Sequence, residues 1–346
     1  MSAALTVGVE EEYLLVDPVT GQNVSVIEQV TAKLPESLVS RSRSEFRRCM
    51  AEMVTEPTVD LSDVREQLSQ NRSAVASAAA SAGVLAVPVG ATPVAETDRR
   101  PVDDPRFVAI ARHYGAIAHD PAVCGTHVHV GVPSRAAAID VCRRIRPWLP
   151  VLQALTVNSP LHEGVDTGYA SWRSVQLDRW PSLGPIPHFE SAEEYDRAVE
   201  SLVASGVMLD ASLVLWHVRP SASYPTVEVR VADTPATVDD TVLLAELVRG
   251  LVGAAVDGPA VADHLLAAAH WNAARAGMSG TLLDPRSGRV RPAWSLVDEL
   301  VGLCDDAPDV VSGLERLKRT GTGADRQRDA LARTGSIPAV LRELAL

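Results

Sequence analysis

The sequence predicts an α+β fold in which a largely antiparallel sheet is flanked by helices. Strand-like and helix-like segments are mixed without the regular strand–helix–strand alternation of a parallel sheet. Residues 212–219 and 226–233 are two strand-like segments joined by a short connection rich in Pro and Ser, which is typical of a hairpin. Helical periodicity prevails after residue 233. The chain has 346 residues and no internal repeat or linker, so we expect one domain over 1–346.

The remaining elements follow from hydrophobic periodicity and from residues that end or cap helices and strands. The segment 46–56 fits a strand or a helix, and Pro57 ends either one. Asp60 or Ser62 can cap the helix that follows. Strands are expected at 4–16, 84–90 and 122–132, and helices at 61–82, 135–157 in two pieces, 191–205, 237–256, 259–275, 293–304, 310–318 and 323–332.

Residues 158–190 differ in texture from the rest of the chain. Gly, Pro, Trp and Asp dominate there, and no period holds. A long irregular segment inside a compact domain is usually disordered or functional, and its Trp and Tyr side chains favour an ordered segment.

Composition excludes several classes of protein. Hydrophobic residues make up 46% of the chain, so it is not fully disordered, and a formal net charge of −12 argues against a broad nucleic-acid surface. No signal peptide or apolar stretch of membrane-spanning length stands out, so we expect a cytoplasmic protein without a membrane partner. The four widely spaced cysteines are expected to be thiols. The sequence leaves open whether the chain forms a homo-oligomer.

Three consecutive glutamates lie in the first predicted strand. Side chains alternate along a strand, so Glu10 and Glu12 share one face and Glu11 lies on the other. Two carboxylates on one face of an apolar strand need either water or a positive partner. The triplet is therefore a solvated edge or a platform for a divalent cation.

Further polar residues follow the same logic. Glu45 and Glu52, with Glu56 close behind, are flanked by arginines, so surface salt bridges are a fair alternative to a functional role. His127 and His129 face one side of a predicted strand, which suits metal ligation but also satisfied core histidines.

The strand 226–233 has a polar and an apolar face. Glu228 and Arg230 share one face and three valines share the other, so the polar pair faces a cleft or forms a simple ion pair. Carboxylates from three segments suit Mg²⁺ or Mn²⁺, and nearby arginines suit phosphoryl transfer from a nucleotide. The sequence has neither a P-loop nor a GxGxxG motif.

Seven separated motifs together resemble one family. They are GVEEEYLLVDP (8–18), Glu45 with Glu52-x-x-Thr55, CGTHVHVGV (124–132), NSP with TGYASWRS (158–174), WHVRPSASYPTVEVRVAD (216–233), WNAARAGM (271–278) and GTGADRQR (321–328). The chain thereby resembles the glutamate–cysteine ligase type 2 family, bacterial carboxylate–amine ligases that share the glutamine synthetase-like catalytic fold.

This resemblance implies a function and a set of site residues. The family joins an acid to an amine with ATP and Mg²⁺ or Mn²⁺ through an acyl phosphate, and glutamate and cysteine are the substrates usually assigned. It implies nucleotide contacts from His127 and Arg230 and catalytic roles for Arg230 and Arg173. It implies metal ligation by Glu10, Glu12, Glu45, Glu52, His127 and Glu228.

Parts of the mechanism stay open. The irregular segment 158–190 is the candidate lid. Glu56, Asp166 and His217 are candidate bases for the amine, and His217 departs from the aspartate that the family usually has there. Two alternatives remain: a metal-dependent amidohydrolase, which also uses an HxH strand, and a non-catalytic member that binds nucleotide or metal.

Overall fold

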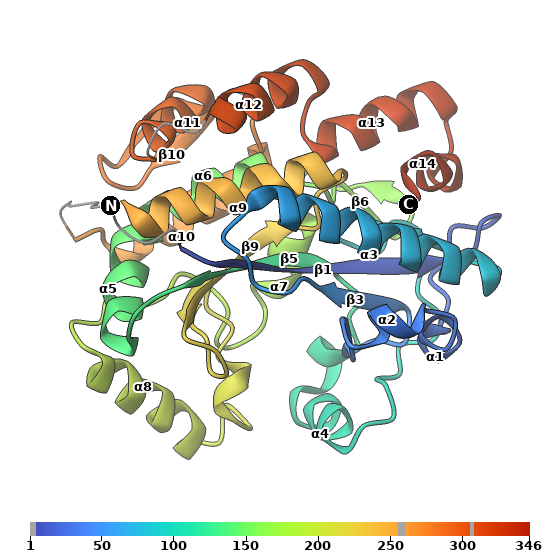
Figure 1. Cartoon of the computed structure of the whole chain (residues 1–346), viewed down its shortest axis with the longest axis horizontal. Helices are drawn as coiled ribbons and strands as arrows, with labels where there is room; N and C mark the ends of the chain where they lie inside the picture. Colours follow the sequence, from blue (N-terminus) through green and yellow to red (C-terminus); the bar gives the residue numbers. More distant parts are fainter. Residues whose placement is uncertain (1–4, 255–259, 305–307) are drawn as a thin grey trace.

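Seven strands form the main sheet of the computed structural model, which describes residues 5–254, 260–304 and 308–346. The strand order is β2-β3-β1-β5-β9-β8, and β4 also pairs with β1. The strands are β1 (Val7–Val16), β2 (Ser42–Arg43), β3 (Met50–Val54), β4 (Leu85–Val87), β5 (Gly125–Gly131), β8 (Val218–Pro220) and β9 (Thr226–Asp233). The pairs in this sheet are antiparallel, which confirms the predicted fold class (Figure 1).

Helices and two small hairpins surround this sheet. The hairpins are β6 (Leu161–His162) with β7 (Val165–Asp166), and β10 (Thr281–Asp284) with β11 (Arg289–Pro292). The helices are α1 (Ile27–Thr31), α2 (Glu36–Val39), α3 (Leu61–Ser81), α4 (Pro105–Tyr114), α5 (Arg135–Ile145), α6 (Leu149–Leu155), α7 (Trp172–Leu177), α8 (Ala192–Ala204), α9 (Val238–Gly253), α10 (Asp263–Ala276), α11 (Ala293–Val301), α12 (Pro308–Thr320), α13 (Gly323–Thr334) and α14 (Ile337–Leu344).

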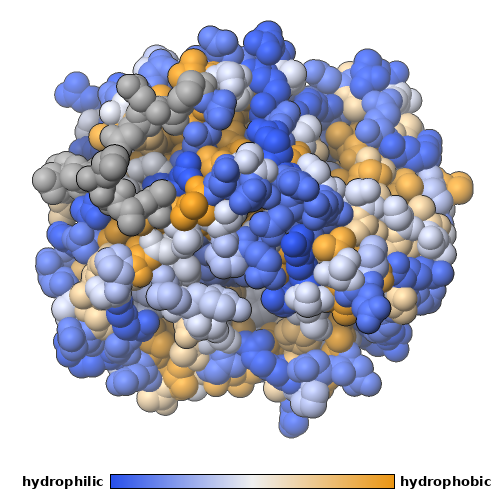
Figure 2. Space-filling view, in the orientation of Figure 1, coloured by the Kyte–Doolittle hydropathy of each residue, from blue (hydrophilic) through white to orange (hydrophobic). Residues whose placement is uncertain are grey.

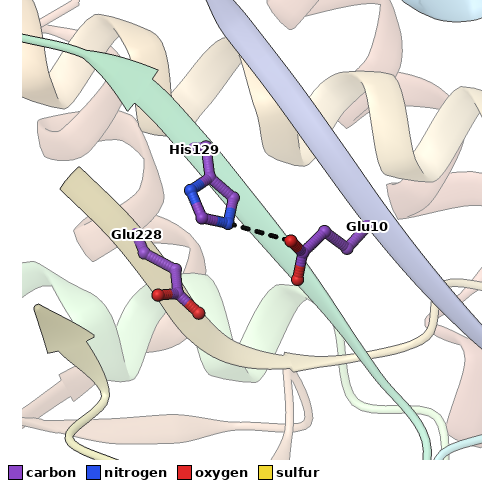
Figure 3. A group of neighbouring side chains, drawn as sticks. All are labelled: Glu10, His129 and Glu228. Carbon is purple, nitrogen blue, oxygen red and sulfur yellow. Dashed lines mark ion pairs between the residues drawn. The ribbon is translucent and has the colours of Figure 1, made fainter. Parts of the chain in front are cut away.

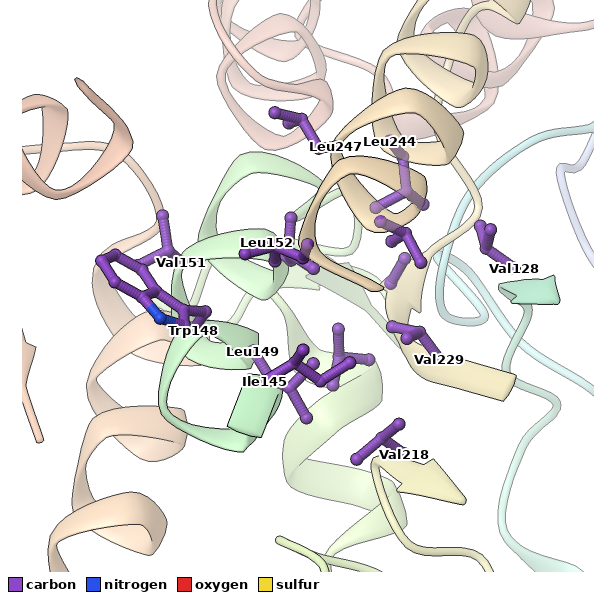
Figure 4. Close-up of a cluster of buried hydrophobic side chains, with 14 of the residues drawn as sticks. Val128, Ile145, Trp148, Leu149, Val151, Leu152, Val218, Val229, Leu244 and Leu247 are labelled. Atoms are coloured by element: carbon purple, nitrogen blue, oxygen red, sulfur yellow. The ribbon is translucent and has the colours of Figure 1, made fainter. Parts of the chain in front are cut away.

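One face of the sheet is covered by α3 and α9 (Figure 1). Val128 on β5 and Val229 on β9 lie in a continuous apolar core with Leu244 and Leu247 of α9 (Figure 4). Burial of such aliphatic side chains is the main force that holds a helix on a sheet. Because side chains alternate along each strand, the polar residues of β5 and β9 face the opposite side of the sheet.

Glu11 is the exception on the helix-covered face, because it is charged and fully buried. Its Oε1 pairs with Arg72 Nη2 of α3 at 2.5 Å and accepts from Thr241 Oγ1 of α9 at 2.6 Å. The Tyr13 hydroxyl donates to Glu11 Oε2 at 2.6 Å. This network compensates the buried charge and ties β1 to both covering helices.

The structure corrects the prediction of helices alone after residue 233. The hairpin β10–β11 interrupts them at the turn Asp284-Pro285, where Gly288 takes a φ of +65°. The α4 and α14 helices were not predicted, although Asp104 caps α4 with Pro105 in its first turn. The ambiguous segment 46–56 forms β3, and the irregular segment 158–190 contains β6, β7 and α7.

Hydrophilic side chains cover most of the face shown in Figure 2, with hydrophobic ones scattered between them. Among the helices of the described ranges, none combines the length and apolarity needed to cross a membrane. Cys49, Cys124 and Cys142 are buried thiols, as the sequence predicted.

Candidate functional site

The face of the sheet away from α3 and α9 carries a cluster of carboxylates. Glu12 of β1 lies directly opposite Glu52 of β3 in the strand register, and Glu45 comes from the loop that joins β2 to β3. Burial, together with repulsion from Glu45, raises the pKa of Glu12 to about 8. Burial and repulsion from Glu45 and Glu12 also raise the pKa of Glu52 well above its usual value. Crowded carboxylates of this kind are suited to bind cations.

A second group spans β1, β5 and β9. Glu10 pairs in register with His127, and His129 pairs with Glu228. His129 Nε2 lies 3.3 Å from Glu10 Oε1, and these two residues and Glu228 can each aim one ligand atom at a common point, all within 4.8 Å of one another (Figure 3). One imidazole and two carboxylates fit a divalent cation.

The family resemblance implied His127 as a metal ligand and did not include His129. His127 Nδ1 lies 2.8 Å from Glu10 Oε2 and 3.4 Å from Arg230 Nη1. Burial and the charge of Arg230 lower the pKa of His127 to about 4, so its ring is neutral near pH 7. The alternation of His-x-His already held the signal, because both rings face one side of β5.

Arginines balance the β9 end of the cluster. Arg230 pairs with Glu228, and Arg219 Nε of β8 pairs with the same carboxylate at 2.8 Å. Burial alone would raise the pKa of Glu228, but the two guanidinium groups hold it well below its usual value. The sequence predicted the Glu228–Arg230 face and missed Arg219.

Arg173 enters the site from α7 and is buried. Its Nη2 donates to the Arg230 carbonyl at 3.3 Å. A Cβ on Gly125 would overlap Arg173 Nη2, so only glycine leaves room for the guanidinium there. Gly125 N–H also donates to Glu12 Oε2 at 2.6 Å, so one residue positions both the arginine and the carboxylate.

Two cavities are lined by residues of this polar row. The Arg173 cavity, of about 370 Å³, is lined by Glu12, Glu45, His127, Arg173 and Arg230, together with apolar side chains. The Tyr224 cavity, of about 690 Å³, is lined by Glu10, Glu56, His129, Pro57 and Tyr224 among others. The β1–β5–β9 strands thus present charged groups to both spaces.

The three candidate bases are scattered. Glu56 is exposed and lines the Tyr224 cavity, whereas Asp166 lies in an ion pair with Arg328 at 2.9 Å. The His217 ring faces His270 Nε2 at 3.2 Å, and burial, with the charge of Arg173, lowers its pKa to about 3. Neither Asp166 nor His217 is among the described residues that line the two cavities.

Comparison with known proteins fits this geometry. A relative from Salinispora tropica, which carries the provisional name glutamate–cysteine ligase 2, is 52% identical over 356 residues, covering 99% of this chain and 94% of the relative. Two solved structures share the fold at a TM-score of 0.73. One is a glutamate–cysteine ligase from Francisella tularensis in complex with AMP, at 12% identity over 99% of this chain and 88% of that one.

The other is a bifunctional glutathione synthetase from Pasteurella multocida, at 14% identity over 98% of this chain, which spans 51% of that longer chain. The model of glutamate–cysteine ligase family 2 matches residues 6–343. The match extends from β1 into α14. This protein therefore belongs to glutamate–cysteine ligase family 2, and it is a carboxylate–amine ligase.

Proposed function

We propose that the protein joins the carboxylate of one small molecule to the amine of another with ATP, and that glutamate and cysteine are the first pair to test. The observation that carries this proposal is the row of glutamates, histidines and arginines between two cavities. One cavity can take a nucleotide and the other the acid and the amine. The names of the relatives support the substrate pair.

In this proposal the adenine base of ATP would bind in the Tyr224 cavity. Val132, Pro133 and the Tyr224 ring give this cavity an apolar wall for a purine. Glu10 and His129 also line this cavity, and the phosphates would meet the sheet beside them. The acid and the amine are placed in the Arg173 cavity beside Glu12 and Arg230.

Mg²⁺ or Mn²⁺ is the cation proposed for the cluster. Glu10, His129 and Glu228 would hold one ion, with His127 beside it, and Glu12, Glu45 and Glu52 offer further ligands. A divalent cation at these positions supplies charge neutralisation between the two anionic reactants. Hard oxygen ligands favour these cations over softer metals.

The chain's own arginines would act on the transferred group. A carboxylate oxygen of the acid attacks the γ-phosphorus of ATP and ADP leaves, which forms an acyl phosphate. Arg230 and Arg173 would stabilise the charge on the phosphoryl oxygens. The neutral amine then attacks the acyl carbon, an amide forms and phosphate leaves. The segment 158–190, which carries α7 and Arg173, is the proposed lid that excludes water.

Trapping with hydroxylamine tests the intermediate. With L-glutamate, ATP and Mg²⁺, hydroxylamine should replace the natural amine and give a glutamyl hydroxamate, detected by mass, together with ADP. Omission of ATP, or addition of EDTA, should abolish the product. Hydroxamate formed equally well without ATP would favour the amidohydrolase alternative, and bound nucleotide without turnover across acids and amines would favour a non-catalytic member.

A further inference from the structure

Asp233, the last residue of β9, is a buried carboxylate that the site described above does not use. Its residue is 1% exposed, and it is not among the described residues that line the two cavities. It lies three positions after Arg230 and pairs with Gly125 in the strand register. A Cβ on Gly90 would overlap the Asp233 carboxyl. A buried carboxylate is costly unless its oxygens accept hydrogen bonds, so its donors indicate its role.

The donors to the Asp233 carboxyl come from two stretches of the segment 158–190. Asn158 N–H and the Ser159 hydroxyl donate to Oδ2 at 2.8 and 2.7 Å. The Ser171 hydroxyl donates to Oδ1 at 2.8 Å. Ser159 and Ser171 also form a bridge of parallel type with each other. One carboxylate therefore draws together the chain before and after the small hairpin β6–β7 and holds both on the end of β9.

Both serines connect this anchor to the first turn of α7, which carries Arg173. Ser159 Oγ accepts from the Arg173 N–H at 3.1 Å. Ser171 is the N-cap of α7, and its hydroxyl accepts from the Ser174 N–H at 3.2 Å. A hydroxyl that donates to a carboxylate is polarised, which makes it a better acceptor for a backbone N–H. Asp233 thus holds the backbone of Arg173 through a single hydroxyl.

The guanidinium end of Arg173 is tied to the same strand. Its Nη2 donates to the carbonyl of Arg230 on β9. Burial lowers the pKa of the Arg173 guanidinium, and the opposite charge of Asp233 counteracts that shift. The backbone and the side chain of Arg173 are therefore both placed relative to β9, the strand that carries Glu228 and Arg230.

We propose that Asp233 is a positioning residue that fixes the first turn of α7 on β9 through Ser159 and Ser171. Arg173 is thereby held where it meets the transferred phosphoryl group, while Asp233 itself contacts neither reactant. This inference rests on the proposed function, which assigns Arg173 to the phosphoryl oxygens, and it adds the residue that holds Arg173 in place. It also divides the proposed lid, because α7 stays on the sheet and closure is left to other parts of 158–190.

Asp233→Asn and Asp284→Asn form a matched pair for the test. Asp284 is also a buried aspartate, and it accepts from the Ser287 hydroxyl at 3.1 Å and from the Arg286 N–H at 3.0 Å in the β10–β11 hairpin. Hydrogen exchange with mass spectrometry compares deuterium uptake over 171–177. Uptake there should rise in Asp233→Asn and stay at the wild-type level in Asp284→Asn. Unchanged uptake in Asp233→Asn would overturn the inference.

Turnover shows whether the anchor matters for the reaction. With L-glutamate, ATP, Mg²⁺ and hydroxylamine, Asp233→Asn should lower kcat about tenfold or more with little change in the KM for ATP, because a small displacement of a reacting group is costly. Asp284→Asn should keep the wild-type kcat even if its Tm falls equally. A normal kcat in Asp233→Asn contradicts the positioning role.

A double variant shows whether Asp233 acts through Arg173. Added to Arg173→Ala, the substitution Asp233→Asn should cost less than about twofold in further kcat, because the positioned side chain is already gone. Residual hydroxamate is measured by mass. The same further loss as in the wild-type background would reduce Asp233 to a fold-stabilising group. If Arg173→Ala makes no product, exchange and the single-variant kcat decide.

Ser171→Ala keeps the test decisive if Asp233→Asn does not fold. It removes one hydroxyl between Asp233 and α7, so exchange over 171–177 should rise and kcat should fall, each by less than in Asp233→Asn. Absence of both effects overturns the inference. Failure of the proposed function looks different: wild type would then release no ADP with any acid and amine. Exchange over 171–177 would still decide whether Asp233 anchors α7.

Discussion

The two faces of β1 carry the same residue type with opposite consequences. Glu11, toward the helices, is enclosed by Arg72, Tyr13 and Thr241, which satisfy its oxygens. Glu10 and Glu12, one residue away on either side, share their face with further carboxylates and with open cavities. The comparison teaches that the partners of a buried carboxylate, rather than its burial, distinguish a fold-holding group from one available to a ligand.

The largest effect on turnover is expected from substitutions on the face of β1 that lines the two cavities. Glu10→Gln and Glu12→Gln each remove one anionic ligand while keeping an amide oxygen that can accept a hydrogen bond. Turnover should fall about a thousandfold because charge between the reactants is no longer screened. The Mg²⁺ concentration for half-activation should rise in steady-state assays of ADP release. Near-normal turnover in both variants would remove the cation site from this face.

Glu11→Gln tests the helix-covered face of β1, where we expect a loss of stability. Arg72 would keep its buried charge without a counter-charge, so the free energy of unfolding should drop by about 3 kcal/mol. Chemical denaturation measures this loss. The folded fraction should keep the wild-type Mg²⁺ dependence, and a shifted Mg²⁺ dependence would mean that the two faces are not independent.

Arg230 and Arg219 sharpen the comparison within the site, because both pair with Glu228. Arg230 lines the Arg173 cavity, whereas Arg219 donates to the carbonyls of Ser212 and Val214. Arg230→Lys should slow turnover about a hundredfold through loss of the planar fork. Arg219→Lys is the control and should mainly lower the Tm. Equal losses of turnover would reduce Arg230 to an ion-pair partner.

The smallest effect concerns pH and the metal-free protein. The folded state raises the pKa of Glu12 from 4.5 to about 8, so the folded protein retains a proton that the unfolded chain releases. Stability of the metal-free protein should therefore fall as the pH rises from about 5 to about 8, by a few degrees in Tm.

Mg²⁺ should restore the lost Tm at the upper end of this range. Glu52→Gln should raise the metal-free Tm there by relieving repulsion, whereas Glu66→Gln on the exposed side of α3 should not. A metal-free Tm that is flat over this range, in EDTA, would argue that the carboxylates are not crowded in solution.

Local pattern predicted the parts of the site that lie on strands. Alternation placed Glu10 and Glu12 together and set Glu228 and Arg230 on a common face, as the register confirms. Glu45 stands in a loop, so its place came from family resemblance, and its position among the other carboxylates depends on the pairing of β2 with β3.

Other groups leave no local trace. Arg47 and Gln176 are 129 positions apart, as their residue numbers show, yet both line the Arg173 cavity, where they donate to the carbonyls of Asp120 and Pro121 respectively. Helix α4 did carry a signal in its cap at Asp104 and Pro105, but its mixed apolar pattern hid it. Contacts that depend on tertiary packing cannot be inferred from spacing along one chain.

The central position of β1 has a consequence for how the chain can fold while it is being synthesised. This strand is made first, yet it lies between β3 and β5, and β5 must in turn pair with β9. Glu228 leaves the ribosome only after about two thirds of the 346 residues. Pairing across such separations is slow, and a nascent chain halted before residue 226 would expose the unpaired edge of β5. Premature termination in that window should yield aggregates rather than a smaller folded unit.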